Sequence, residues 1–282
     1  EALTADISRM KKLGFNMLRK HAKIEPERFY YHCDQLGMLV WQDMVNGGSA
    51  YKHWFVTYLA TLMNWNHISF SDDEKHAGLL SRLHPEGKDE FRREITETIA
   101  FLYNHPSIVV WVPFNEGWGQ FDALAVCEQI RTLDSSRLVD HASGWFDQKG
   151  GDILSLHYYF LKLKFKPESK RAAALTEFGG YSLSFPGHSC CKKVYGYKKF
   201  NSTGTLTYGY IDLIRQTILP AVKKGIGATV YTQLSDIEEE TNGIYTYDRE
   251  ICKIDPDTLR KWNRALKEAG ECKTYADHTT DH

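Results

Sequence analysis

Short runs of apolar residues alternate along this chain with longer segments in which apolar residues recur every three or four positions. Each run is too short for a helix and is bounded by glycine, proline or polar residues, which is typical of buried β-strands. Seven strands are predicted in this way, at residues 16–20, 38–43, 108–112, 138–144, 153–159, 172–178 and 227–233.

The segments between these runs carry the apolar stripes of helices. Ile7, Met10 and Leu13 form the first stripe, and a second helix is expected to begin at Pro26 and to end at Gly37. Strands that alternate with helices indicate βα units and a parallel sheet, and therefore the α/β class. Further stripes lie at Phe91/Ile95/Ile99/Leu102, Leu124/Cys127/Ile130, Ile211/Ile214/Ile218 and Leu259/Trp262/Leu266.

Three long connections interrupt this alternation. Residues Asn46–Pro85 are rich in aromatic and polar residues, and connections of this length are usually functional or partly helical. Because this segment follows a predicted strand, we expect it to cover the active-site edge of the sheet. Phe160–Arg171 and Ser182–Thr205 are basic, glycine-containing loops, whereas 271–282 reads as a polar tail after a domain that spans 1–270.

Composition and charge exclude several classes of function. The chain has 282 residues with 35 basic and 36 acidic side chains, so nothing favours nucleic acid or an anionic membrane surface as a partner. No apolar stretch approaches the roughly 20 residues needed to cross a bilayer, and we expect a soluble protein without membrane insertion. Six cysteines in a chain of this length are not a disulfide framework, and no metal-binding spacing occurs, so neither a metal nor a cofactor is predicted.

Two glutamates make the sequence readable as an enzyme. Glu116 follows the run at 108–112, and Glu177 lies at the end of the run at 172–178. The carboxyl ends of parallel strands are where α/β barrels place their active sites. A carboxylate that is buried there without a role would be costly.

At this point the chain resembles glycoside hydrolase family 2, the family of β-galactosidases, β-glucuronidases and β-mannosidases. The resemblance rests on G-F-N-x-x-R at Gly14–Arg19, C-D-Q-L-G at Cys33–Gly37, N-H-P-S-I followed by W-x-x-x-N-E up to Glu116, and L-T-E-F-G at Leu175–Gly179. These motifs occur in the family's order. They imply a (β/α)8 TIM barrel of which this chain, starting at the helix after strand one, lacks the first strand. They also imply upstream β-sandwich domains of the same polypeptide.

The resemblance assigns roles to several residues. Glu116 matches the family's acid/base and Glu177 its nucleophile, the pair of a retaining mechanism. Arg19 matches the arginine that contacts the nucleophile, and Asn115 matches the asparagine that binds the sugar 2-hydroxyl. The remaining substrate-binding candidates are His157 and Tyr159, at a strand end that faces the nucleophile, and Tyr231, where many relatives have a tryptophan under the sugar. Tyr158 is the alternative to Tyr159.

The sequence therefore predicts a retaining, exo-acting β-glycosidase that removes terminal neutral sugars, most similar to β-galactosidases. A glucuronidase-type N-x-K element is not evident, which favours a neutral sugar. β-Mannosidase or β-glucuronidase specificity and a non-catalytic carbohydrate-binding fragment are the alternatives. The expected partners are the carbohydrate substrate and the upstream domains, with homo-oligomers left open.

Overall fold

The computed structural model describes residues 1–52, 54–66, 68–159, 163–191 and 193–276. Within them the chain forms two compact units. Unit 1 comprises Glu1–Ser8, Asn16–His157 and Glu168–Ala172, and unit 2 comprises Arg9–Phe15, Tyr158–Pro167 and Ala173–His282. Helix α1 (Ala2–Lys12) contributes to both units.

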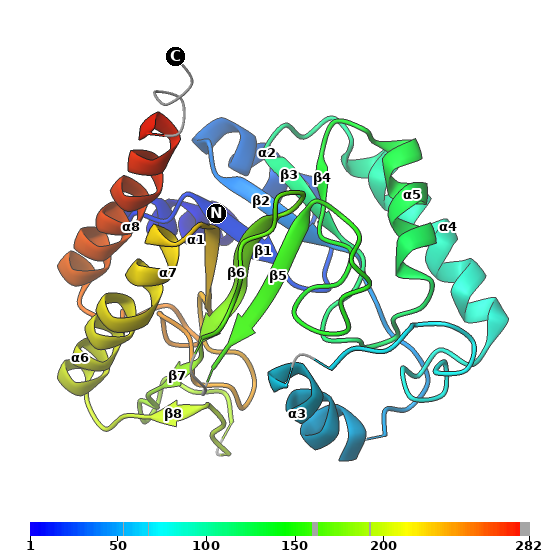
Figure 1. Cartoon of the computed structure of the whole chain (residues 1–282). Coiled ribbons are helices and arrows are strands. Elements are labelled where there is room, and N and C mark those ends of the chain that lie inside the picture. The colour runs from blue at the N-terminus through cyan, green and yellow to red at the C-terminus, as the bar shows by residue number, and fades with distance from the viewer. Residues whose placement is uncertain (53, 67, 160–162, 192, 277–282) are drawn as a thin grey trace. The chain divides into compact units, whose positions relative to one another are not determined.

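Unit 1 contains a parallel sheet in which the strands lie in chain order (Figure 1). The strands are β1 (Met17–Lys20), β2 (Leu39–Asp43), β3 (Ile108–Val112) and β4 (Leu138–Val139), and β5 (Ile153–Tyr158) follows in the chain. Met17 is paired with Leu39 and Val110 with Leu138. Successive strands in this order require a crossover on each connection, and helices provide all three.

The connecting helices of unit 1 are α2 (Glu27–Leu36), α4 (Pro85–Leu102) and α5 (Ala123–Leu133). Helix α2 ends at Gly37, whose left-handed backbone (φ 63°) accommodates the C-cap hydrogen bonds to Cys33 and Asp34. Pro85 occupies the first turn of α4, where its missing N–H is not needed. Figure 1 shows α4 and α5 side by side, and the two helices are in contact.

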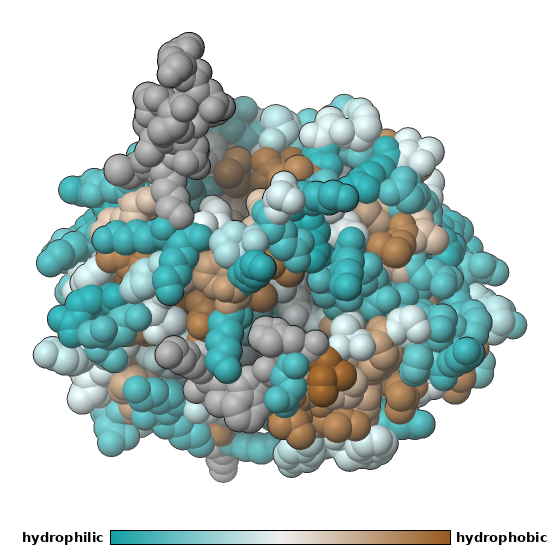
Figure 2. Space-filling model, in the orientation of Figure 1, coloured by the Kyte–Doolittle hydropathy of each residue, from teal (hydrophilic) through white to brown (hydrophobic). Residues whose placement is uncertain are grey.

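The long connection at 46–83 is partly helical, as predicted. It contains the π-helical turn η1 (Phe55–Leu59) and α3 (Ala60–Trp65). A core cluster of Phe55, Ala60, Leu80 and Phe146 anchors it to the segment after β4. Its outer face exposes large hydrophobic side chains, and Figure 2 shows hydrophobic residues gathered over α3.

Unit 2 is built around the parallel pair of β6 (Ala172–Gly179) and β9 (Ile226–Thr232). Between them run the short pair β7 (Tyr181–Ser182) and β8 (Lys198–Lys199) and the continuous helical segment α6 (Thr203–Leu213), η2 (Ile214–Ile218) and α7 (Leu219–Lys223). A capping box begins α6, because the Ser202 hydroxyl accepts from the Thr205 N–H and the Thr205 hydroxyl accepts from the Ser202 N–H. Helix α8 (Pro256–Ala276) contacts α6 and α7 (Figure 1).

The seven predicted strands are present, each within a few residues of its expected bounds. Regular pairing in β4 stops at Val139, five residues before the predicted end, although Asn115 and Ser143 form a further parallel bridge. The strands β7 and β8 were not predicted, because two polar or mixed residues carry no periodicity. Helix α8 runs to Ala276, so the first residues of the predicted tail are helical and 277–282 lie outside the described residues. Among the described helices, none combines the length and the hydrophobicity that a membrane span needs.

Candidate active site

Glu116 lies just beyond the carboxyl end of β3. Its N–H donates to the Ser143 carbonyl at 2.9 Å, and the Ser143 N–H donates to the Phe114 carbonyl, so pairing between the segments after β3 and β4 continues past the regular strands. The Glu116 backbone is left-handed (φ 51°), a conformation rare for residues with a side chain and found most often where the surrounding structure enforces it. Its side chain is 15% exposed.

His157, on β5, faces this carboxyl. Its Nδ1 lies 2.9 Å from Glu116 Oε1, and its Nε2 lies 3.2 Å from the Ser143 hydroxyl. The imidazole is almost fully buried, so its orientation is held on both nitrogens. The resemblance places His157 at a strand end that faces the nucleophile, and that role stays a prediction; within unit 1 its imidazole lies against Glu116.

Arg19, at the end of β1, is bound by a carboxylate that the sequence analysis did not select. Its Nε and Nη2 donate to the two oxygens of Asp43 at 3.0 and 2.9 Å, and both side chains are 3% exposed. Nη2 also donates to Asn115 Oδ1 at 2.8 Å. Because the amide oxygen of Asn115 is held by Arg19, its NH2 group is free to point elsewhere and can act as a donor.

The second strand-end glutamate belongs to unit 2. Glu177 lies in β6, and the Tyr159 hydroxyl donates to Glu177 Oε2 at 2.5 Å. The same hydroxyl lies 3.2 Å from the Thr232 hydroxyl on β9, and the Tyr159 ring stacks on Tyr197 with centroids 4.0 Å apart. Of the two tyrosines considered, it is thus Tyr159 whose hydroxyl contacts the glutamate.

Residues 1–218 match the family model described as the TIM barrel domain of glycosyl hydrolases family 2. The chain belongs to this family. The predicted α/β barrel class is thereby confirmed, and the parallel sheets of both units agree with it.

Individual family 2 relatives are only distantly similar. A β-galactosidase of Leuconostoc mesenteroides is 26% identical over 96% of this chain and 24% of its own length. β-Mannosidase B of Thermothelomyces thermophilus is 32% identical, but over 33% of this chain and 8% of its own length. The family 2 β-galacturonidase of Eisenbergiella tayi, bound to galacturonate, is similar in structure with a TM-score of 0.63 and 18% identity, over 94% of this chain and 47% of that protein. This chain thus spans less than half the length of these relatives.

Two buried acids of this family 2 domain were missed by the sequence analysis. Asp43 ends an apolar strand just as Glu116 and Glu177 do, so the same signal could have found it. Asp140 follows β4 and is fully buried, and neither of its oxygens has a hydrogen-bond partner by distance and angle. Burial raises the pKa of Asp140 to about 6, against the opposing effects of Arg19, His141 and the nearby Ser155 hydroxyl.

Tyr231 is not presented as a platform for a sugar. It is 9% exposed, and its ring packs edge-on against Phe178 and Tyr210 in the core of unit 2. Burial raises the pKa of its hydroxyl. This placement gives no support to the predicted stacking of Tyr231 on the substrate, which stays a prediction.

One group of residues in unit 2 could hold a divalent cation. His188 Nδ1 lies 2.7 Å from Asp248 Oδ2 and 3.8 Å from Glu250 Oε2. Histidine and carboxylate oxygen are ordinary ligands of such ions. No short motif in the sequence indicates this group, since His188 and Asp248 are 60 positions apart. In the described structure the imidazole and the carboxylates pair with one another.

Proposed function

We propose that this chain is the catalytic portion of a retaining, exo-acting β-glycosidase that removes terminal β-linked neutral sugars, with Glu116 as acid/base and Glu177 as nucleophile. The observation that carries the proposal is the difference between the two strand-end glutamates. Glu177 accepts a hydrogen bond from a phenol, and Glu116 is paired with an imidazole. The two carboxyls thus stand in environments that suit different roles.

In the first step a carboxylate oxygen of Glu177 forms a bond to the anomeric carbon. The glycosidic C–O bond breaks, its electron pair stays on the leaving oxygen, and that oxygen takes the proton of Glu116. A hydrogen bond donated to a carboxylate stabilises its ionised form, so the Tyr159 hydroxyl supports the state that a nucleophile needs.

In the second step Glu116 changes from general acid to general base. Its carboxylate removes a proton from water, the water oxygen bonds to the anomeric carbon, and Glu177 leaves as a carboxylate. Two inversions retain the β configuration. A retaining mechanism of this kind requires the two carboxyls to be ~5 Å apart, whereas ~6.5–9.5 Å would favour inversion.

Arg19 and Asn115 act on substrate rather than on the proton transfers. Because Asp43 already accepts two hydrogen bonds from Arg19, the guanidinium is held rigidly and fixes the amide of Asn115. An amide fixed in this way can donate to a sugar hydroxyl, and we assign it to the 2-hydroxyl. Contact of Arg19 with Glu177 remains part of the proposal.

A neutral sugar of the galactose type is supported by the β-galactosidase relative, which matches nearly the whole chain. Relatives named β-mannosidase, β-glucuronidase and β-galacturonidase define the competing specificities. A panel of 4-nitrophenyl glycosides, tested with the full polypeptide including any β-sandwich domains, distinguishes them. Sugar binding without turnover of any member would instead favour the non-catalytic alternative.

The roles of the glutamates are tested by exchanging each for glutamine. Glu177→Gln should abolish turnover of every substrate, because the amide cannot form the glycosyl-enzyme. Glu116→Gln should lower the rate of hydrolysis ~10²–10⁴-fold for substrates with poor leaving groups. It should still react with activated aryl glycosides, whose leaving groups need little protonation. Added azide should then release the glycosyl-enzyme as a β-glycosyl azide, since a small anion needs no general base.

Glu97→Gln, at an exposed position of α4, is the control and should behave as the unchanged protein. Rescue of Glu177→Gln by azide to a β-glycosyl azide, together with an unresponsive Glu116→Gln, would exchange the two roles. An α-configured first product from the unchanged enzyme, detected by NMR, would exclude retention.

A further inference from the structure

Two aromatic side chains are exposed beside the turn that carries Glu116. Trp118 is 39% exposed and Tyr51, from the long connection after β2, is 37% exposed. Their ring centroids lie 5.2 Å apart with an interplanar angle of 39°. Neither ring belongs to the core cluster of the connection, whose members Phe55 and Phe146 are almost fully buried.

The turn that presents Trp118 is held rigidly. Glu116, Gly117 and Gly119 all have positive φ (51°, 74° and 63°), and a side chain on Gly117 would collide with the Phe146 ring at 2.3 Å. The Trp118 N–H donates to the Asn115 carbonyl at 3.0 Å, which closes the turn on the residue before the acid/base. The backbone that carries Trp118 is therefore held in place next to Glu116.

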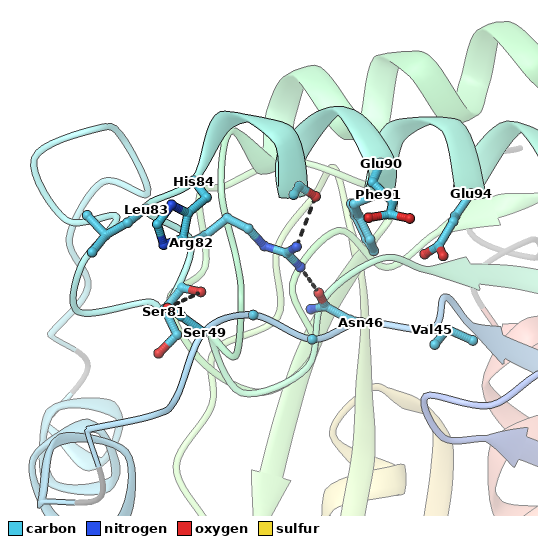
Figure 3. A pocket seen from close by; sticks show the side chains of 13 residues that line it. Val45, Asn46, Ser49, Ser81, Arg82, Leu83, His84, Glu90, Phe91 and Glu94 are labelled. Atoms are coloured by element: carbon cyan, nitrogen blue, oxygen red, sulfur yellow. Dashed lines mark hydrogen bonds between the residues drawn. The ribbon is translucent and has the colours of Figure 1, made fainter.

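Contacts from the long connection fix the other side of this turn. The Gly119 N–H donates to the Leu80 carbonyl at 2.8 Å, and Arg82 Nε donates to the Gly119 carbonyl at 3.0 Å. The Asn46 amide donates to the Trp118 carbonyl. Figure 3 shows Arg82 reaching across a cavity of about 480 Å³ to Asn46 and to the first turn of α4. The segment that supplies Tyr51 and the turn that supplies Trp118 are thus tied together.

The position of this pair relative to the reaction follows from the role of Glu116. A general acid lies beside the leaving oxygen, so the leaving group must pass the residues that adjoin the acid. Trp118 is two residues from Glu116, which limits their Cα separation to about 7 Å. Because the two side chains start so close together on the backbone, the indole is within reach of the leaving group and not only of the sugar that is cleaved off.

We propose, resting on the proposed function, that Tyr51 and Trp118 form the platform for the leaving group and select substrates in which it presents a flat apolar face, above all a second sugar ring. The apolar face of a pyranose packs on the rings and leaves bulk water, while its hydroxyls remain solvated at the edge. The two rings, tilted relative to each other, fit one face and one edge of such a group.

The test compares two substrates that make the same glycosyl-enzyme and both need Glu116. Lactose has a sugar as leaving group, whereas methyl β-galactoside has an alkyl group with nothing to stack. Trp118→Ala and Tyr51→Ala should each lower kcat/KM for lactose roughly five- to twentyfold, and should leave kcat/KM for methyl β-galactoside within about twofold. Trp118→Phe should retain most of the activity on lactose.

Tyr58→Ala is the matched control, since Tyr58 lies in the same connection and is 70% exposed. It should leave kcat/KM unchanged for both substrates. An equal loss with lactose and methyl β-galactoside would show that Trp118 only orients Glu116 and would overturn the inference, as would no loss with either. If the unchanged protein hydrolyses no glycoside of the panel, the proposed function fails, and the inference fails with it.

Discussion

At the scale of single residues, unit 1 buries the acids Asp43 and Asp140 in addition to carrying the proposed acid/base. Asp43 is matched by Arg19, but Asp140 is fully buried and pays for its charge without a hydrogen bond of good geometry. It follows β4 as Glu116 follows β3. Because Asp140 is buried near the Arg19–Asp43 pair, its ionisation makes the free energy of unfolding depend on pH.

The raised pKa of Asp140 fixes the sign of that dependence. Because its folded pKa of about 6 exceeds the ordinary 3.8, the folded state binds more protons between these values, and the free energy of unfolding falls as pH rises through this window. The loss is at most about 3 kcal/mol. Asp140→Asn should flatten the decline between pH 4 and 6, measured by urea unfolding. If the free energy of unfolding fell with pH equally in the variant and in the unchanged protein, Asp140 would not be the cause of the decline, and the prediction would be wrong.

At the scale of elements, the loop between β9 and α8 is organised by one buried cation. Lys253 Nζ donates to the carbonyls of Leu183 and Thr241 at 2.9 and 2.8 Å and to Asp236 Oδ1 at 2.6 Å, so all three of its protons are used. Burial lowers the pKa of Lys253 and raises that of Asp236, although each partner opposes the shift of the other. The pair ties the loop to the segment after β7.

Removal of Lys253 should therefore destabilise unit 2. Lys253→Met leaves the buried Asp236 uncompensated, and we expect the free energy of unfolding to fall by about 3–5 kcal/mol. The double variant Lys253→Met/Asp236→Asn should recover part of this loss, since it removes the buried charge. Lys223→Met, at an exposed position of α7, is the control. A loss no larger than that of the control, in thermal or urea unfolding, would contradict a structural role for the pair.

At the scale of the whole molecule, carboxylates with lowered pKa values join distant parts of unit 1. Burial alone would raise the pKa of Asp134, but hydrogen bonds from Ser136, Arg137 and Trp111 lower it to about 2. The pKa of Asp147 is likewise lowered, because hydrogen bonds from His141 and Arg171 outweigh its burial. The hydrogen bonds to Asp134 and to Asp147 stabilise the ionised carboxylates, and they exist only in the folded state.

These acids predict a loss of stability on the acid side. A folded pKa below the unfolded value contributes stability above about pH 4, and that contribution disappears as pH falls toward about 2. Together with the opposite slope of Asp140, the free energy of unfolding should be greatest near pH 4–5. Unfolding curves between pH 2 and 8 measure this directly. Stability that rose steadily from pH 4 to 7 would show that other groups dominate.

The sequence by itself located seven strands, most of the helices and the two glutamates. Runs such as Ile108–Val112 were found because a strand that is covered on both faces is mostly apolar. Glu116 and Glu177 were found because each lies at the end of such a run, a pattern that neighbouring residues in the sequence are enough to reveal. The match of residues 1–218 to the family 2 model confirmed the barrel class.

Only the tertiary structure decided which side chains meet. Arg19 and Asp43 are 24 positions apart, and Asp140 derives its raised pKa from burial that no local pattern reveals. The edge-on packing of Tyr231 against Tyr210 is also a contact that no local pattern reveals. The pairing of Tyr51 with Trp118 likewise depends on how a 40-residue connection folds back. These contacts join residues that are far apart in the sequence. Local sequence allows many such pairings about equally well, and only the packing of the complete fold selects one of them.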